Sequence, residues 1–87
     1  MQHYLILMLL LIPLMTLSQP KQDPDSLLRQ LYLTTQPSQQ IEINNLLADI
    51  YLRSDPSRAS SFARQALFLA ESIDDQKGKA IALYHLA

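Results

Sequence analysis

Residues 56–72, PSRASSFARQALFLAES, carry the pattern that decides the fold. From Ala59 onward, small or apolar side chains recur at i, i+3, i+4, i+7, i+11 and i+14. This spacing places them on one face of a helix. The face consists largely of alanine, whose small side chain lets two antiparallel helices approach closely. The pattern therefore predicts a tightly packed helix with a buried stripe made of Ala59, Phe62, Ala63, Ala66, Ala70 and Ile73.

The two ends of this predicted helix carry capping residues. Asp55 is expected to cap the start, and Pro56 to occupy the first helical position, where its missing N–H has no cost. Beyond the other end, Asp74 and Asp75 are neighbours in sequence, so they do not face each other across a substrate as an acid/base pair does. We interpret them as a capping turn that extends through residues 74–78 and includes Gly78.

The pattern of residues 39–53 predicts a second amphipathic helix, which precedes the alanine-rich helix in the chain. Pro37 disfavours the helical conformation at the preceding residue, so Ser38 is the expected N-cap. The apolar residues fall at i, i+3, i+4, i+7 and i+8, as on one face of a helix. They are Ile43, Leu46, Leu47, Ile50 and Tyr51.

Two shorter helical stripes flank these helices. The first predicts a helix over residues 26–33, with Asp25 as N-cap and with Leu27, Leu28 and Leu31 on one side. The second begins near Lys79 and predicts a last helix with an apolar stripe of Ile81, Leu83, Tyr84 and Leu86.

Residues 4–17 form an apolar block, YLILMLLLIPLMTL, that predicts an export signal. As a helix, a block of this length covers roughly 21 Å, less than the roughly 30 Å of bilayer hydrocarbon. Thr16-Leu17-Ser18 offers small residues where signal peptidase cleaves. We predict a signal peptide at residues 1–18 and a disordered tether at residues 19–24. An uncleaved membrane anchor is the alternative, because no Lys or Arg precedes the block.

The sequence repeats itself at an offset of 39 residues. NLLADIY at residues 45–51 is echoed by LYHLA at residues 83–87, with Leu47-Ala48 matching Leu86-Ala87. Helix–turn–helix units that recur at such a spacing are typical of solenoids, in which each unit buries its apolar face against a neighbour.

At these positions the sequence resembles the tetratricopeptide repeat family, through Leu47, Ala48 and Tyr51 in one helix and Ala59, Ala63 and Ala66 in the next. The resemblance implies an all-α fold of antiparallel helix–turn–helix repeats, that is, a fragment of an α-solenoid after the signal peptide. It divides the chain into a leading helix and loop at residues 25–37, a complete repeat at 38–74 and the first helix of a second repeat at 75–87.

The long form of the repeat also looks like the sensor regions of Bacteroidetes-type envelope histidine kinases. The matching elements are Asp25-Ser26-Leu27-Leu28 and Asp55-Pro56-Ser57-Arg58-Ala59. This likeness implies an exported protein-interaction or sensory input module, periplasmic or in the cell envelope, within a larger signalling protein. Two alternatives are the N-terminal part of a sensor histidine kinase whose catalytic domain lies beyond Ala87, and a small membrane-anchored helical protein.

Composition argues against several chemistries. The chain has no Cys, which excludes a disulfide framework, a cysteine–zinc site and a thiol nucleophile. Gly78 is its only glycine, so it has no phosphate-binding loop. Seven Lys and Arg residues balance eight Asp and Glu residues, which gives no basic stripe for nucleic acid. We expect no catalytic site, cofactor or metal, and a solvated position for His85.

Polar residues on the 39–53 helix form the candidate partner-binding site. In tetratricopeptide proteins the first helices of successive repeats line a groove that binds extended peptides. The resemblance therefore implies contact with a protein or peptide partner through Glu42, Asn45, Asp49 and Arg53. The alternative is a solvated face in which Asp49 and Arg53 form an i, i+4 ion pair worth a few tenths of a kcal/mol. The family's clamp for peptide carboxylates is not matched, and Asp49 would repel such a group.

Membrane contact is expected only through the signal segment or a further anchor. The apolar stripe of the last helix, residues 81–86, also allows self-association.

Overall fold

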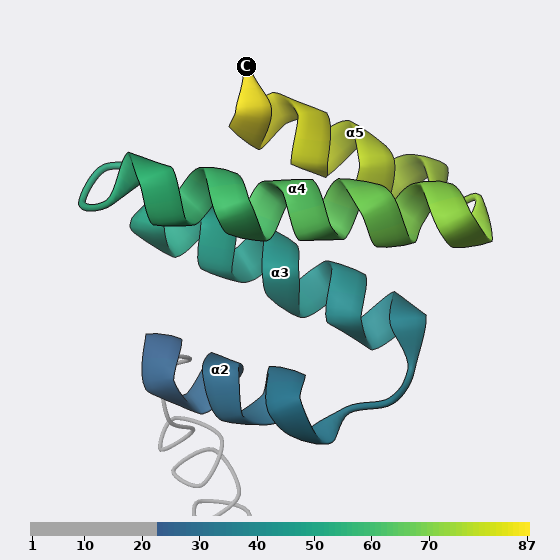
Figure 1. Cartoon of the computed structure of the whole chain (residues 1–87), viewed down its shortest axis with the longest axis horizontal. Helices are drawn as coiled ribbons and strands as arrows, with labels where there is room; N and C mark the ends of the chain where they lie inside the picture. Colours follow the sequence, from purple (N-terminus) through teal and green to yellow (C-terminus); the bar gives the residue numbers. More distant parts are fainter. Residues whose placement is uncertain (1–22) are drawn as a thin grey trace, which may run out of the picture.

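The computed structural model describes residues 23–87, which contain four α-helices and no β-strand (Figure 1). The helices are α2 (Pro24–Leu33), α3 (Pro37–Tyr51), α4 (Pro56–Ile73) and α5 (Gln76–Leu86). The predicted all-α class is thereby confirmed for these residues. The predicted signal peptide and residues 19–22 of the predicted tether lie outside the described residues. Among residues 23–87, none of the helices has both the length and the apolar character of a membrane span.

The helices are stacked in chain order, from α2 at one edge to α5 at the other (Figure 1). Helix α3 contacts each of the other three helices, whereas α2 contacts α3 alone. Helix α4 lies against both α3 and α5. The arrangement brings α5 back against α3, although the whole of α4 separates them in sequence.

Aspartate side chains cap three of the four helices, each by accepting a hydrogen bond from the N–H of the third helical residue. The distances are 2.7 Å at Asp23, 3.2 Å at Asp55 and 3.0 Å at Asp75. The predicted start at Asp55-Pro56 is confirmed, as is the capping role of Asp74 and Asp75. Asp74 ends α4 in the left-handed conformation, at φ 58°, which aspartate tolerates better than most residues.

Two predicted caps are wrong for one physical reason. Helix α2 is capped by Asp23, not Asp25, and α3 begins after Gln36 rather than after Ser38. In both helices a proline occupies the first helical position, where it has no hydrogen bond to lose. The cap is therefore the residue before the proline. Residues 23 and 24 of the predicted tether thus belong to the capped start of α2.

Two helix boundaries also differ from the prediction. Helix α3 ends at Tyr51, so Arg53 lies in the following turn. Helix α5 begins at Gln76 rather than near Lys79, which places Gly78 in its first turn and not in a loop. The connection between α4 and α5 is correspondingly tight and consists of Asp74 and Asp75.

The alanine stripe of α4 forms much of the core. Ala59, Ala63, Ala66 and Ala70 are all buried, as predicted. Ile73 is 45% exposed, contrary to the prediction, because it is the last residue of α4 and lies at the turn. Larger core side chains come mainly from α2 and α3 and are Leu27, Ile41, Ile43 and Leu47.

Helix α3 buries more of its surface than one amphipathic stripe predicts. Of the predicted stripe, Ile43 and Leu47 are buried, whereas Ile50 is 38% exposed. Helices on several sides of α3 also cover residues outside the stripe, namely Ile41, Asn44, Asn45 and Ala48. The apolar stripe predicted for α5 is left largely open, with Leu83 and Tyr84 both exposed.

Candidate functional site

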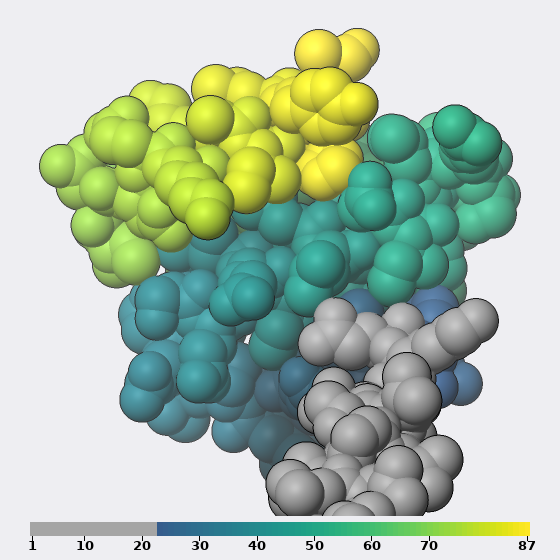
Figure 2. Space-filling view, turned by 180° about the vertical axis from the view of Figure 1, so that it is seen from behind, coloured from purple at the N-terminus to yellow at the C-terminus, as the bar shows by residue number. Residues whose placement is uncertain are grey.

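A hollow of about 580 Å³ lies between α3 and α5, and we call it the α3/α5 hollow. Figure 2 looks onto the face that the two helices share, where the yellow-green atoms of α5 lie above the teal atoms of α3. From α3 the lining consists of Ser38, Ile41, Glu42, Asn45, Leu46 and Asp49. From α5 and its cap it consists of Asp75, Lys77, Gly78, Ile81, Tyr84 and His85.

Three of the four predicted partner-binding residues line this hollow, namely Glu42, Asn45 and Asp49. The fourth, Arg53, is not among the lining residues, because α3 ends at Tyr51 and the chain then turns away. The sequence therefore identified the α3 wall. It did not identify the α5 wall.

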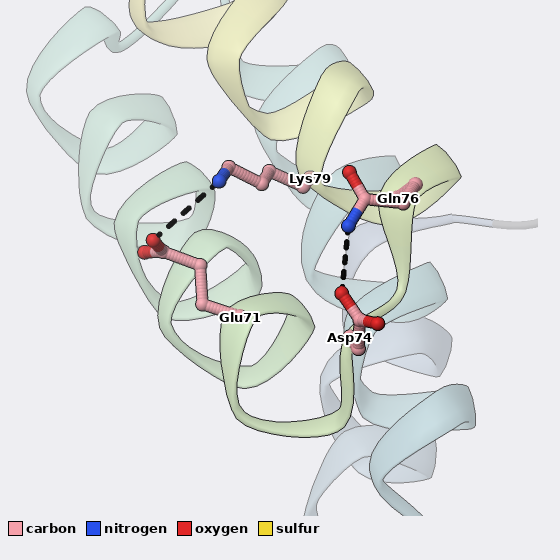
Figure 3. A network of polar contacts seen from close by, with 4 residues as sticks. All are labelled: Glu71, Asp74, Gln76 and Lys79. Atoms are coloured by element: carbon pink, nitrogen blue, oxygen red, sulfur yellow. Dashed lines mark hydrogen bonds and ion pairs between the residues drawn. The ribbon is translucent and has the colours of Figure 1, made fainter.

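The ion pair between Asp49 and Arg53 that belongs to the alternative of a solvated helix face does not form within residues 23–87. Within residues 23–87, the ion pair that forms joins Lys79 on α5 to Glu71 on α4, with 3.7 Å between Nζ and Oε2 (Figure 3). The same view shows Gln76 donating to Asp74 at 2.7 Å beside the turn between the two helices. These polar contacts lie beside the turn between α4 and α5, and in the part of the chain that the structure describes the carboxylates of the α3/α5 hollow form no ion pair.

Asn45 has a different environment from the solvated one that its polarity predicts. It is only 6% exposed, and its Nδ2 donates to the backbone carbonyl of Gly78 at 3.2 Å. This hydrogen bond ties the middle of α3 to the first turn of α5. The other atom of the amide, Oδ1, is buried and has no hydrogen-bond partner in the described part of the chain.

At Gly78 the backbone of α5 lies in close contact with α3. A Cβ atom added there would lie 2.6 Å from Cγ2 of Ile41 and 2.7 Å from Oδ2 of Asp75. Both distances are shorter than side-chain atoms accept, so glycine is what lets the carbonyl of this residue reach Asn45. Gly78 thus serves helix packing, and not the turn for which glycine is often selected.

Gly78→Ala tests this close approach. Alanine favours a helix interior by up to about 1 kcal/mol over glycine, but overpacking costs about 1–3 kcal/mol. We expect the variant to lose about 1–2 kcal/mol of unfolding free energy, measured by urea denaturation followed by circular dichroism. Ala80→Gly, at an exposed position of the same helix, measures the difference in helix propensity between alanine and glycine alone. A Gly78→Ala protein more stable than wild type would contradict the packing described here.

His85 is half-buried at the edge of the same hollow, which corrects the expectation of a fully solvated residue. Its ring meets that of Tyr84 edge-on, with 5.5 Å between centroids. Its Nδ1 is buried and has no hydrogen-bond partner among the described residues. In residues 23–87, three side-chain polar atoms share that condition, and two of them, on Asn45 and His85, belong to residues of the α3/α5 hollow.

A second hollow of about 560 Å³ lies between α2 and α3. Glu42 and Leu46 line both hollows, whereas neither Asn45 nor Asp49 lines this one. Among residues 23–87, no three side chains of the metal-binding types gather closely enough to hold an ion. The α3/α5 hollow therefore concentrates the predicted residues and the unpartnered polar atoms in one place.

Comparison with known proteins adds no relative: no family model, no curated protein and no solved structure matches this chain. The geometry of the α3/α5 hollow is consequently the main ground for a functional proposal. Its lining combines carboxylates, hydrogen-bonding atoms and apolar side chains.

Proposed function

We propose that this chain is a protein-interaction module of the tetratricopeptide type, in which the α3/α5 hollow holds an extended segment of a partner protein. One observation carries the proposal. The hollow lies between two helices that begin 39 residues apart, at Pro37 and Gln76, and this is the offset of the sequence echo.

The contacts of α4 support the same proposal. Because α4 packs on both α3 and α5, α3 and α4 correspond to one repeat and α5 to the first helix of the next. In a solenoid, first helices of successive repeats lie side by side and form one continuous surface. The α3/α5 hollow occupies that position, with Glu42, Asn45 and Asp49 on the α3 wall.

The proposal includes export and a role in sensory input. Its supports are the apolar block at residues 4–17 and the likeness of residues 25–28 and 55–59 to envelope sensor proteins. In this role the module recognises a protein or peptide partner on the envelope side and passes that information to the remainder of a signalling protein.

A pair of tyrosine variants tests the binding site. Linear peptides are selected from a random display library on the full chain, held in a non-ionic detergent, and their affinities are then measured for Tyr84→Ala and Tyr32→Ala. Tyr84 lines the hollow and is 73% exposed, whereas Tyr32 on α2 is 90% exposed and lies outside it. Both side chains are open to solvent, so neither truncation is expected to unfold the protein.

Tyr84→Ala should weaken the selected peptides about tenfold, because a buried interface tyrosine commonly contributes more than about 1 kcal/mol to binding. Tyr32→Ala should leave their affinities unchanged. Failure to select any peptide, or selected peptides that lose affinity only with Tyr32→Ala, would contradict the proposed site.

A further inference from the structure

We infer that the partner segment is basic, an extended peptide with two Lys or Arg side chains three residues apart and an apolar side chain between them. It lies across the α3/α5 hollow, with its cations at Glu42 and Asp49. This inference rests on the proposed function and specifies the chemistry of the segment that the hollow accepts.

The spacing of the two carboxylates sets the spacing of the cations. Glu42 and Asp49 are both exposed, both line the hollow and stand two helical turns apart on α3. At about 1.5 Å per residue, their seven-residue separation covers about 10 Å along the helix. In an extended chain of the polyproline II type, which has three residues per turn and rises about 3.1 Å per residue, side chains three residues apart lie on the same side, about 9 Å from each other.

The charges of the lining favour a cationic occupant. Asp75 adds a third carboxylate to those of Glu42 and Asp49, and Lys77 is the one lysine among the lining residues. The ion pair of the described residues, Glu71–Lys79, involves none of these four. An acidic peptide or a terminal carboxylate would meet this excess of negative charge, whereas a basic segment would pair with it.

Apolar side chains on both walls of the hollow account for the central apolar residue of the segment. Leu46 on α3 is half-buried, and Ile81 on the opposite wall is 38% exposed. Beside them the exposed ring of Tyr84 offers a face to a cation or to an apolar side chain.

Asn45 provides a second and independent indication of a bound chain. Its hydrogen bond to Gly78 identifies Nδ2 as the donor, which leaves Oδ1 as an acceptor in the wall of the hollow. That acceptor is buried and unpartnered, a condition that proteins rarely leave uncorrected. Asn45 is located between Glu42 and Asp49 on α3, so a peptide that bridges these two carboxylates passes directly over the residue with the unpartnered acceptor.

Three labelled peptides with one scaffold test the inference: a basic peptide containing KALK, its neutral form QALQ and its acidic form EALE. Binding to the full chain in a non-ionic detergent is measured by fluorescence anisotropy at low and at moderate salt. The double variant Glu42→Gln/Asp49→Asn removes the two carboxylates of the hollow. The matched control, Asp25→Asn/Glu71→Gln, changes net charge equally at exposed positions outside the lining.

We expect the basic peptide to bind best and to weaken as salt screens the charges. Glu42→Gln/Asp49→Asn should weaken it about three- to tenfold, as for two partly exposed ion pairs, while the control leaves it within about twofold. An equal loss of affinity for the basic peptide in both double variants would show that only net charge matters and would overturn the inference.

The remaining outcomes separate the inference from the proposed function. If the neutral or acidic peptide binds as well as the basic one and is weakened by Tyr84→Ala, the basic preference is wrong and the binding site stands. If none of the three peptides binds, while peptides from the random library do so through Tyr84, the basic motif is again wrong. If no peptide of either source binds, both are wrong.

Discussion

Leu47→Ala is expected to unfold a large part of the helical structure. Leu47 is completely buried and packs in one cluster with Leu27 and Ile43. Truncating a buried leucine to alanine costs about 2–5 kcal/mol, since apolar contacts are lost and a cavity remains. A domain of this size has a total stability of about 3–10 kcal/mol. The single change therefore removes a large fraction of that stability.

Urea denaturation of the full chain, followed by circular dichroism, measures this loss. Leu33→Ala is the matched control, because Leu33 lies in α2 with 71% of its surface exposed. The control should shift the unfolding free energy by less than about 0.5 kcal/mol. Equal losses in the two variants would show that the core is not centred on Leu47.

Ala63→Leu should have the next largest effect, through the opposite error of overpacking. Ala63 lies in the buried stripe of α4 and has no exposed surface. The neighbouring helix leaves room only for a methyl group at this position, so a leucine side chain must displace that helix. The expected cost is about 1–3 kcal/mol.

Ser61→Leu, at an exposed position of α4, is the control for this substitution. It introduces the same side chain at a position that no other helix covers. In thermal melts, the melting temperature of Ala63→Leu should therefore be well below that of Ser61→Leu. The reverse ranking would place the buried face of α4 on the wrong side.

The sequence predicted the helices well wherever local chemistry alone determines a boundary. Asp55-Pro56 is the clearest case, because a carboxylate followed by proline fixes both the cap and the first helical residue. The same dipeptide occurs at Asp23-Pro24, where the prediction places a tether although identical reasoning applies. That error was avoidable from the sequence.

The errors at Asn45 and Gly78 were of another kind. A polar residue on an amphipathic helix predicts exposure, and an isolated glycine predicts a turn. The two residues are 33 positions apart, and the hydrogen bond between them exists only once α5 lies on α3. No local pattern carries that information, because the partner is supplied by tertiary packing.

In the candidate site, too, local sequence patterns predict one part and tertiary packing determines the other. Helical spacing places Glu42 and Asp49 on one face of α3, the family resemblance predicts that this face contacts a partner, and both residues line the α3/α5 hollow. For the opposite wall, with Ile81 and Tyr84, the sequence predicts only an apolar stripe that allows self-association. Its contribution to a hollow depends on how closely α5 approaches α3, which Gly78 permits.

Because one wall of the α3/α5 hollow is on α3 and the other on α5, occupancy and helix docking are thermodynamically linked. A ligand that needs both walls binds only while α5 is seated, so its binding free energy adds to the stability of that state. At a hundred times its Kd, such a ligand contributes about 2.7 kcal/mol. The hydrogen bond from Asn45 to Gly78 is one of the contacts that form when α5 docks on α3. If the proposed function holds, a higher ligand concentration therefore raises the fraction of molecules in which α5 is docked.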